Sequence, residues 1–161
     1  VEAISAMVED LPDDAVIGAG TIITPADLEK AVKAGSTFLV SPGTTPALIE
    51  AAKASPVPLL AGVATPTEAM NLYVQGFTHQ KFFPAEAAGG VPMLKSIAGP
   101  LPQITFCPTG GIDLAKAPSY LALPNVHCVG GTWMAPKELM KAGRWDEIER
   151  LAREAASLPR S

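Results

Sequence analysis

The sequence has little charge, few cysteines and no long hydrophobic run. Charged residues make up only 17% of the 161 residues, with a formal net charge of -4 at pH 7 and no block of Lys and Arg. We therefore do not expect nucleic acid or an anionic membrane as the main partner. The longest apolar stretches, such as residues 15–23, are interrupted by glycine and are too short to span a bilayer. The two cysteines, Cys107 and Cys128, stand apart in apolar runs, which is typical of buried, reduced thiols and favours a cytoplasmic location.

Histidine is also scarce, since only His79 and His127 are present. A metal site would need several His or carboxylate ligands converging on one ion. Two histidines do not make that case, so we interpret both as packing or hydrogen-bonded residues and expect no metal. The sequence also lacks a Ser-His-acid combination at a nucleophile elbow, which disfavours hydrolase chemistry.

What the sequence does contain is a repeat of strand-like runs. These runs begin near Ala15, Thr37, Val57, His79, Gln103 and Val126. The intervals of 20–24 residues fit one strand, one loop and one helix each. The runs are almost continuously apolar, as expected for strands that are covered on both faces of a parallel sheet. The sequence therefore predicts an α/β fold of successive βα units, in a single domain over residues 1–161.

The segments between the runs carry helix signals. Residues 24–27 and 65–68 each place a Thr at the N-cap, Pro at the first helical position and an acid at the third. The second of these has the pattern of a full capping box. Thr45 repeats the cap without the acid, and Gly35 and Gly76 stand where helix C-caps are expected.

Two glycine-rich turns, residues 108–111 and 130–132, follow the last two runs. Glycine lets backbone N–H groups approach an anion closely, and a following helix start adds its positive end. In (β/α)8 TIM barrels the loops after strands 7 and 8 commonly hold phosphate. If these are those loops, the chain supplies about six βα units, strands 3–8, and lacks the first two units, on the order of 45 residues.

Lys81 is the only one of the eight lysines that falls on a predicted strand. A lysine that points into a barrel loses hydration, which lowers its pKa. The neutral amine can then attack a carbonyl carbon, and the resulting imine accepts electrons during carbon–carbon cleavage. The apolar neighbours Phe82, Phe83 and Pro84 favour this interpretation over a strand-end lysine whose head reaches solvent.

Several motifs, in order and with matching spacing, carry a family resemblance. They are residues 81–86 (KFFPAE), 106–112 (FCPTGGI), 130–133 (GGTW), 18–21 (GAGT) and 41–43 (SPG). The chain resembles the 2-keto-3-deoxy-6-phosphogluconate aldolases, which overlap the 4-hydroxy-2-oxoglutarate aldolases. The resemblance implies a class I aldolase, which is a carbon–carbon lyase without metal or cofactor, and it assigns no preference between the gluconate and galactonate series. It would cleave a phosphorylated keto acid into pyruvate and glyceraldehyde 3-phosphate, as a homotrimer.

The same resemblance implies roles for particular residues. It puts the Schiff base on Lys81, the pyruvate carboxylate near Thr21 and Thr109, the phosphate at Gly110, Gly111, Gly131 and Thr132, and Phe83 in the pocket wall. Many family members have Ser where this chain has Thr132. The family's general-base Glu and a phosphate-binding Arg lie in a stretch like L-E-V-T-x-R, and nothing in this sequence matches it.

Two acids follow predicted strand ends within the chain. Asp113 has the position of a helix cap. Glu86 follows Lys81 by five residues and is placed either to assist proton transfer or to make a loop hydrogen bond. Two other functions stay open: another phosphate-binding barrel enzyme, such as an isomerase or synthase, in which Lys81 acts electrostatically, and a truncated barrel that only binds anions.

Overall fold

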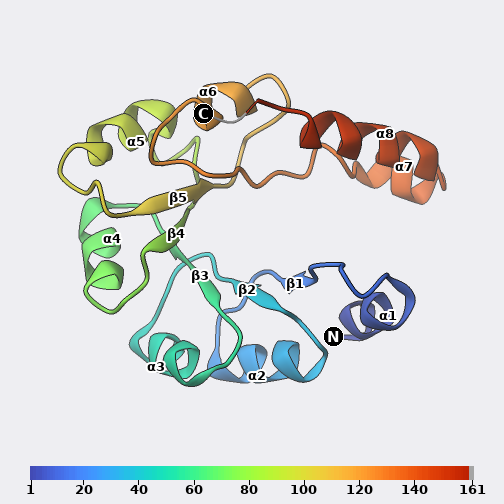
Figure 1. Ribbon diagram of the computed structural model, residues 1–161, viewed down its shortest axis with the longest axis horizontal. Helices are drawn as coiled ribbons and strands as arrows, with labels where there is room; N and C mark the ends of the chain where they lie inside the picture. Colours follow the sequence, from blue (N-terminus) through green and yellow to red (C-terminus); the bar gives the residue numbers. More distant parts are fainter. Residues whose placement is uncertain (160–161) are drawn as a thin grey trace. The chain divides into compact units, whose positions relative to one another are not determined.

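Strands and helices alternate along the chain (Figure 1). The computed structural model describes residues 1–159. The elements up to residue 82 are α1 (Glu2–Asp10), β1 (Gly18–Ala19), α2 (Pro25–Lys33), β2 (Phe38–Val40), α3 (Pro46–Ala54), β3 (Leu59–Val63), α4 (Pro66–Tyr73) and β4 (His79–Phe82). Those that follow are α5 (Gly90–Ala98), β5 (Thr105–Pro108), α6 (Ala117–Leu121), α7 (Lys137–Lys141) and α8 (Trp145–Ala156).

The chain forms two compact units. The first comprises Val1–Val63 and Thr67–Lys81, and the second comprises Ala64–Pro66 and the chain from Phe82 onward. The strand order in the sheet follows the chain, β1-β2-β3-β4-β5. The predicted parallel α/β fold is therefore confirmed, while the expectation of one domain with strands 3–8 of a barrel stays a prediction.

Short-range hydrogen bonds set the starts of α2 and α3. The Thr24 hydroxyl accepts from the Asp27 N–H at 3.1 Å, and Asp27 Oδ2 accepts from the Thr24 N–H at 3.0 Å. This is a full capping box, which satisfies N–H groups that the first turn leaves without helical partners. Thr45 caps α3 by accepting from the Leu48 N–H at 3.2 Å. Gly35 follows α2 with φ of 98°, a backbone conformation that favours glycine.

The core of the first unit lies between its strands and two helices. β1, β2 and β3 pair in parallel, with Leu39 opposite Leu59. α2 and α3 lie side by side along one face of these strands (Figure 1). Leu39 is fully buried, and Leu28 of α2 and Leu48 of α3 are buried against the same layer. Burial of these apolar side chains holds the strand ends in place.

The second unit is built around β5. The Phe106 ring packs edge to face on Phe82, with 6.3 Å between ring centroids. The Asn125 side chain donates to the Leu94 carbonyl of α5 at 3.0 Å, which ties the segment after α6 to that helix. Tyr120 of α6 is 1% exposed and completes this core.

Two sequence expectations need correction. The predicted strand that begins near Val126 forms only two isolated parallel bridges within the described residues, Phe106 with Val126 and Thr109 with Gly130. The run between them does not stay in a continuous ladder with β5, and His127 and Cys128 are exposed there. Cys128 is therefore not the buried thiol that we expected, although no disulfide joins it to Cys107 in the described chain.

Among residues 1–159, no helix has the length and apolar character that crossing a membrane requires.

Candidate functional site

The turn after β5 is held by the segment that follows β4. The Thr109 N–H donates to the Phe82 carbonyl at 2.9 Å, which continues the strand pairing. The Ala85 N–H then donates to the Thr109 carbonyl at 2.8 Å, and the Glu86 N–H donates to the Gly110 carbonyl at 3.1 Å. The carbonyls of Thr109 and Gly110 are thus both hydrogen-bonded to the segment that follows β4.

This pairing decides where the N–H groups of the turn point. In a planar trans peptide the C=O and the following N–H point in opposite directions. Because the Thr109 and Gly110 carbonyls face Ala85 and Glu86, the Gly110 and Gly111 N–H groups face away from them. Within the described part of the chain, neither N–H donates a backbone hydrogen bond. Two adjacent donors with this common orientation form a cradle of the kind that binds anions.

Only glycine fits in this turn. Gly110 and Gly111 have φ of 107° and 76°, where side chains are strained. A Cβ at Gly110 would lie 3.3 Å from the Ala85 nitrogen and 3.4 Å from the Phe83 ring. A Cβ at Gly111 would lie 2.8 Å from Glu86 Cγ. The Phe83 ring is therefore close to the turn, and its role in a pocket wall stays a prediction.

The second glycine turn lies next to the first. The Gly130 N–H donates to the Pro108 carbonyl at 2.8 Å, and Gly130 pairs with Thr109. A Cβ at Gly131 would overlap the ring of Trp133, which lies over this glycine. Thr132 follows as an exposed residue. The second unit therefore brings together all the residues that sequence reasoning assigned to phosphate, together with Thr109.

Glu86 takes part in a side-chain network that the sequence did not reveal. Its Oε2 lies 2.7 Å from Lys116 Nζ, and its Oε1 accepts from the Tyr120 hydroxyl. Hydrogen bonds from Lys116 and Tyr120 hold the pKa of Glu86 below its usual value. The same pairing raises the pKa of Lys116. Of the two roles that the sequence left open for Glu86, the structure shows the contacts of a loop hydrogen-bonding residue, and proton transfer stays a prediction.

Asp113 was predicted to cap a helix; it caps the turn that leads into α6, whose N-cap position is occupied by Lys116. Its carboxylate accepts from the Lys116 N–H at 2.9 Å, and its carbonyl accepts from the Ala117 N–H at 3.0 Å. The cap fixes the turn that contains Lys116 and leads into α6, the helix that carries Tyr120. Neither Lys116 nor Tyr120 belongs to a recognisable sequence motif. The only local sequence pattern that indicates this helix start is Asp113, four residues before Ala117.

Lys81 lies on β4, as predicted, and the alternation of this strand shows which face it occupies. Gln80 is fully buried, and its side-chain amide donates to the carbonyls of Ala69 in α4 and Phe77 at 3.0 and 2.9 Å. Successive side chains of a strand point to opposite faces. Lys81, the next residue, therefore lies on the face of β4 opposite α4, where it is half-buried.

Thr21, the other residue of the first unit with an expected role, has an unusual backbone. Its φ is 62°, and it is the one non-glycine residue of the described chain with positive φ. A β-branched residue in this region is strained, and such strain clusters at functional sites.

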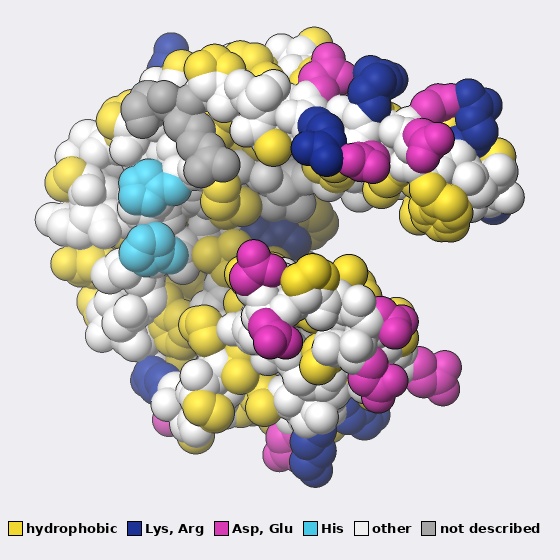
Figure 2. All heavy atoms as spheres, turned by 45° about the vertical axis from the view of Figure 1, so that its right-hand side comes forward, with side chains coloured by type: hydrophobic (Ala, Val, Ile, Leu, Met, Phe, Trp, Pro, Cys, Tyr) yellow, Lys and Arg dark blue, Asp and Glu magenta, His cyan; other side chains and the backbone are white. Residues whose placement is uncertain are grey.

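The histidines do not pack in the core. Both are exposed, and Figure 2 shows the imidazoles (cyan) at the surface. His79 Nδ1 lies 3.1 Å from the Thr78 hydroxyl, so the hydrogen-bonded alternative applies to it. Within residues 1–159, no group of three or more His, Cys, Asp or Glu side chains is arranged to hold a metal ion.

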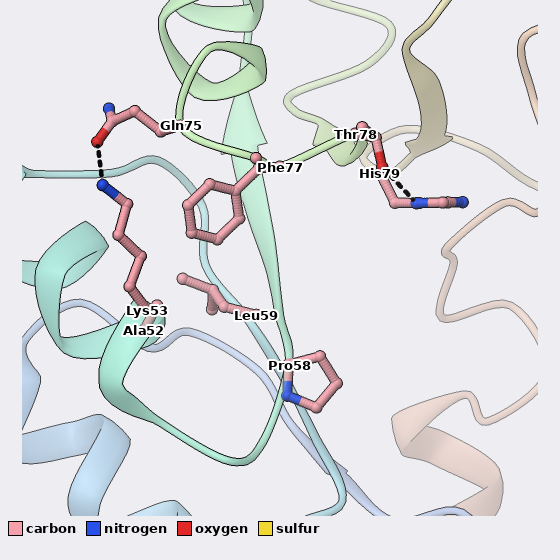
Figure 3. A pocket seen from close by; sticks show the side chains of 9 residues that line it. Ala52, Lys53, Pro58, Leu59, Gln75, Phe77, Thr78 and His79 are labelled. Carbon is pink, nitrogen blue, oxygen red and sulfur yellow. Dashed lines mark hydrogen bonds between the residues drawn. The ribbon is translucent and has the colours of Figure 1, made fainter.

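A pocket of the first unit lies at the amino ends of β3 and β4. Pro58 and Leu59 at the start of β3 line it together with Phe77 and His79 (Figure 3). Lys53 borders it, and its ammonium donates to Gln75 Oε1 at 2.9 Å and Glu50 Oε1 at 3.1 Å. Catalytic groups of barrel enzymes gather at the carboxyl ends of the strands, so this pocket is not part of the candidate site.

Comparison with known proteins agrees with the motifs. The family model described as KDPG and KHG aldolase matches residues 1–151. The 2-dehydro-3-deoxy-phosphogluconate aldolase of Pseudomonas aeruginosa is 52% identical over 139 residues. This match covers 86% of the chain but only 63% of the length of that relative.

Solved structures show the same relationship. The KDPG aldolase of Legionella pneumophila, with pyruvate captured as a covalent carbinolamine intermediate, matches with a TM-score of 0.93 and 47% identity. It aligns with 96% of the chain, which covers 74% of that enzyme. The Zymomonas mobilis aldolase with 3-phosphoglycerate matches with a TM-score of 0.91 and 44% identity, over 99% of the chain and 74% of the enzyme. Both relatives are aldolases, a class of lyase.

Proposed function

The chain belongs to the KDPG and KHG aldolase family, and we propose that the protein carrying it is a class I aldolase with Lys81 as the Schiff-base residue. The observation that carries this proposal is the position of Lys81 on β4 in a chain whose Legionella pneumophila relative holds pyruvate covalently. The proposed substrate is 2-keto-3-deoxy-6-phosphogluconate, and the products are pyruvate and glyceraldehyde 3-phosphate.

The proposed chemistry uses the lysine amine as an electron sink. The Lys81 amine adds to the keto carbon C2 and water leaves, which forms an imine. The protonated imine draws electrons from the C3–C4 bond, which breaks as a base takes the C4 hydroxyl proton. Glyceraldehyde 3-phosphate leaves, and the enamine of pyruvate remains on the lysine. Protonation at C3 and addition of water then release pyruvate and restore the amine.

The phosphate would bind in the second unit. The cradle of Gly110 and Gly111 N–H groups supports this assignment, as does the adjacent turn with Gly131 and Thr132. The Phe83 ring beside Gly110 supports its role in the pocket wall. Thr109 and Thr21 would bind the pyruvate carboxylate, and the strained backbone of Thr21 supports its part. These roles are proposals for the full-length protein.

Borohydride trapping tests the proposal. The full-length protein is incubated with pyruvate, reduced with borohydride and digested with trypsin for mass spectrometry. The expected result is added mass on Lys81 and a missed tryptic cut after it. Omission of pyruvate is the control. An adduct on another lysine, or none, would contradict the covalent mechanism and favour a phosphate-binding barrel enzyme without an imine.

Two further properties are proposed, the cellular location from the scarcity of cysteine and the oligomeric state from the family resemblance. We propose that the full-length protein acts in the cytoplasm and assembles as a homotrimer. Light scattering coupled to gel filtration should give three times the mass of one full-length chain. A monomer at micromolar concentration would contradict the trimer.

A further inference from the structure

The carbonyl of Gly111 is bound by Lys116, a residue to which the sequence assigned no role. Lys116 Nζ donates to this carbonyl at 2.9 Å. The same ammonium lies 2.7 Å from Glu86 Oε2, so its position is set from two sides. The backbone N–H of Lys116 is held by Asp113, which also fixes where its side chain begins.

Tyr120 anchors this arrangement in the core. It lies in α6, four residues after Lys116, which directly precedes this helix, and it is 1% exposed. Its hydroxyl donates to Glu86 Oε1, the oxygen that Lys116 does not contact. Both oxygens of Glu86 are therefore held, one by Tyr120 of α6 and the other by Lys116 just before this helix, and Glu86 in turn holds Lys116 against the turn.

The bond to Gly111 orients one more peptide of the cradle. Because the Gly111 carbonyl points at Lys116, the Ile112 N–H in the same peptide plane points the opposite way. Gly111 has no side chain to restrain this peptide, and its φ of 76° is one of several values that glycine can adopt. The Ile112 N–H donates no backbone hydrogen bond within the described residues.

We propose that Lys116, held by Glu86 and Tyr120, is a positioning residue that fixes the Gly111–Ile112 peptide and so adds a third N–H to the phosphate cradle. The inference rests on the proposed phosphate role of this turn. Lys116 acts through the peptide that it orients, because its ammonium is bound to the carbonyl side of the turn. Glu86 keeps it there and balances its charge.

The test compares substrates with and without phosphate. The full-length Lys116→Met variant should raise KM for 2-keto-3-deoxy-6-phosphogluconate about tenfold, the scale of one lost charged hydrogen bond. Cleavage of 4-hydroxy-2-oxoglutarate and trapping with pyruvate should stay within about twofold of wild type, since neither needs the cradle. Lys116→Arg keeps a charged donor and should restore part of the affinity. Lys95→Met, at an exposed position of α5, is the matched control and should change neither KM.

A second measurement separates positioning from simple charge. Removing a negative charge near an anion site should strengthen binding of inorganic phosphate. If Glu86 positions Lys116, Glu86→Gln should instead weaken it several-fold in calorimetry, and Tyr120→Phe should weaken it in the same direction. Tighter phosphate binding by Glu86→Gln, or equal losses by Lys116→Met on both substrates, would overturn the inference.

These outcomes also separate this inference from the proposed function. If the wild-type protein traps no pyruvate, the aldolase proposal fails, and phosphate binding by the same variants still decides the role of Lys116. If the wild-type protein binds no phosphate, the inference fails, and trapping on Lys81 still supports the covalent mechanism.

Discussion

Thr109 and Gly130 are bridge partners in the second unit, and a Cβ built at Gly130 would lie 2.5 Å from the Thr109 hydroxyl oxygen. The pairing joins the two glycine turns, which are separated in the chain by a whole helical segment. Thr109 occupies the space that a side chain at position 130 would need. This backbone contact therefore links Thr109, which is proposed to bind the pyruvate carboxylate, to the second glycine turn, which is proposed to bind phosphate.

Gly130→Ala should disturb both turns. The added methyl group must displace Thr109, and overpacking of this kind typically costs about 1–3 kcal/mol. We expect a lower Tm and weaker phosphate binding. Calorimetry and thermal unfolding measure both effects. Gly99→Ala is the control, because nothing lies within 4 Å of a Cβ at Gly99. Equal behaviour of the two variants would show that the turns do not depend on this contact.

Lys81→Arg should abolish the covalent chemistry. Arginine keeps the positive charge but has no amine that forms an imine. We expect no pyruvate adduct after borohydride reduction and a loss of kcat/KM of at least about a thousandfold, as for other enzymes without their nucleophile. Binding of inorganic phosphate should persist, which shows that the variant is folded. A trapped adduct in Lys81→Arg would place the imine on another residue.

Glu86 should contribute to stability in a pH-dependent way. Hydrogen bonds from Lys116 and Tyr120 lower its pKa from the ordinary value of 4.5, so the contribution is present above that pH and is lost as the pH falls through the folded pKa. Glu86→Gln should therefore lower Tm at about pH 7 more than at about pH 3. Glu29→Gln, at an exposed position of α2, is the control. A Tm difference that does not shrink in acid would contradict the ion pair.

Thr24→Ala should destabilise the first unit by removing the cap of α2. The hydroxyl accepts from the Asp27 N–H, and loss of such a cap typically costs about 1 kcal/mol. Denaturant unfolding of the full-length protein measures the change. Thr67→Ala, an exposed threonine within α4, should not lower stability comparably. No difference between the variants would mean that the capping box does not contribute.

Chelator treatment should leave activity and trapping unchanged. In the proposed mechanism the imine activates the carbonyl carbon, so no Lewis-acid metal is required. Activity before and after dialysis against EDTA, with metal content measured in both samples, checks this. A divalent ion bound tightly at His79 or His127, together with lost activity, would show metal-dependent chemistry.

Sequence alone located the features that depend on neighbours in the chain. The caps at Thr24 and Thr45 act over three residues, so their pattern is visible in any short segment. Lys81 could be placed on a strand because its neighbours are apolar and the strand runs repeat at a regular interval. The first glycine turn could be recognised because positive φ, as at Gly110 and Gly111, is costly for other residues. The motifs around them also indicated the family, which the comparisons confirm.

Only the tertiary structure decided how distant residues combine. Whether the run after Val126 forms a strand depends on hydrogen bonds to β5, and only two isolated bridges form. Glu86 and Tyr120 are 34 residues apart, so no local pattern predicts that they share a hydrogen bond. The sequence therefore left Glu86 with two equal roles. Packing of α6 beside the turn brings Lys116 to the Gly111 carbonyl, because contacts between distant segments depend on how the whole unit buries its apolar side chains.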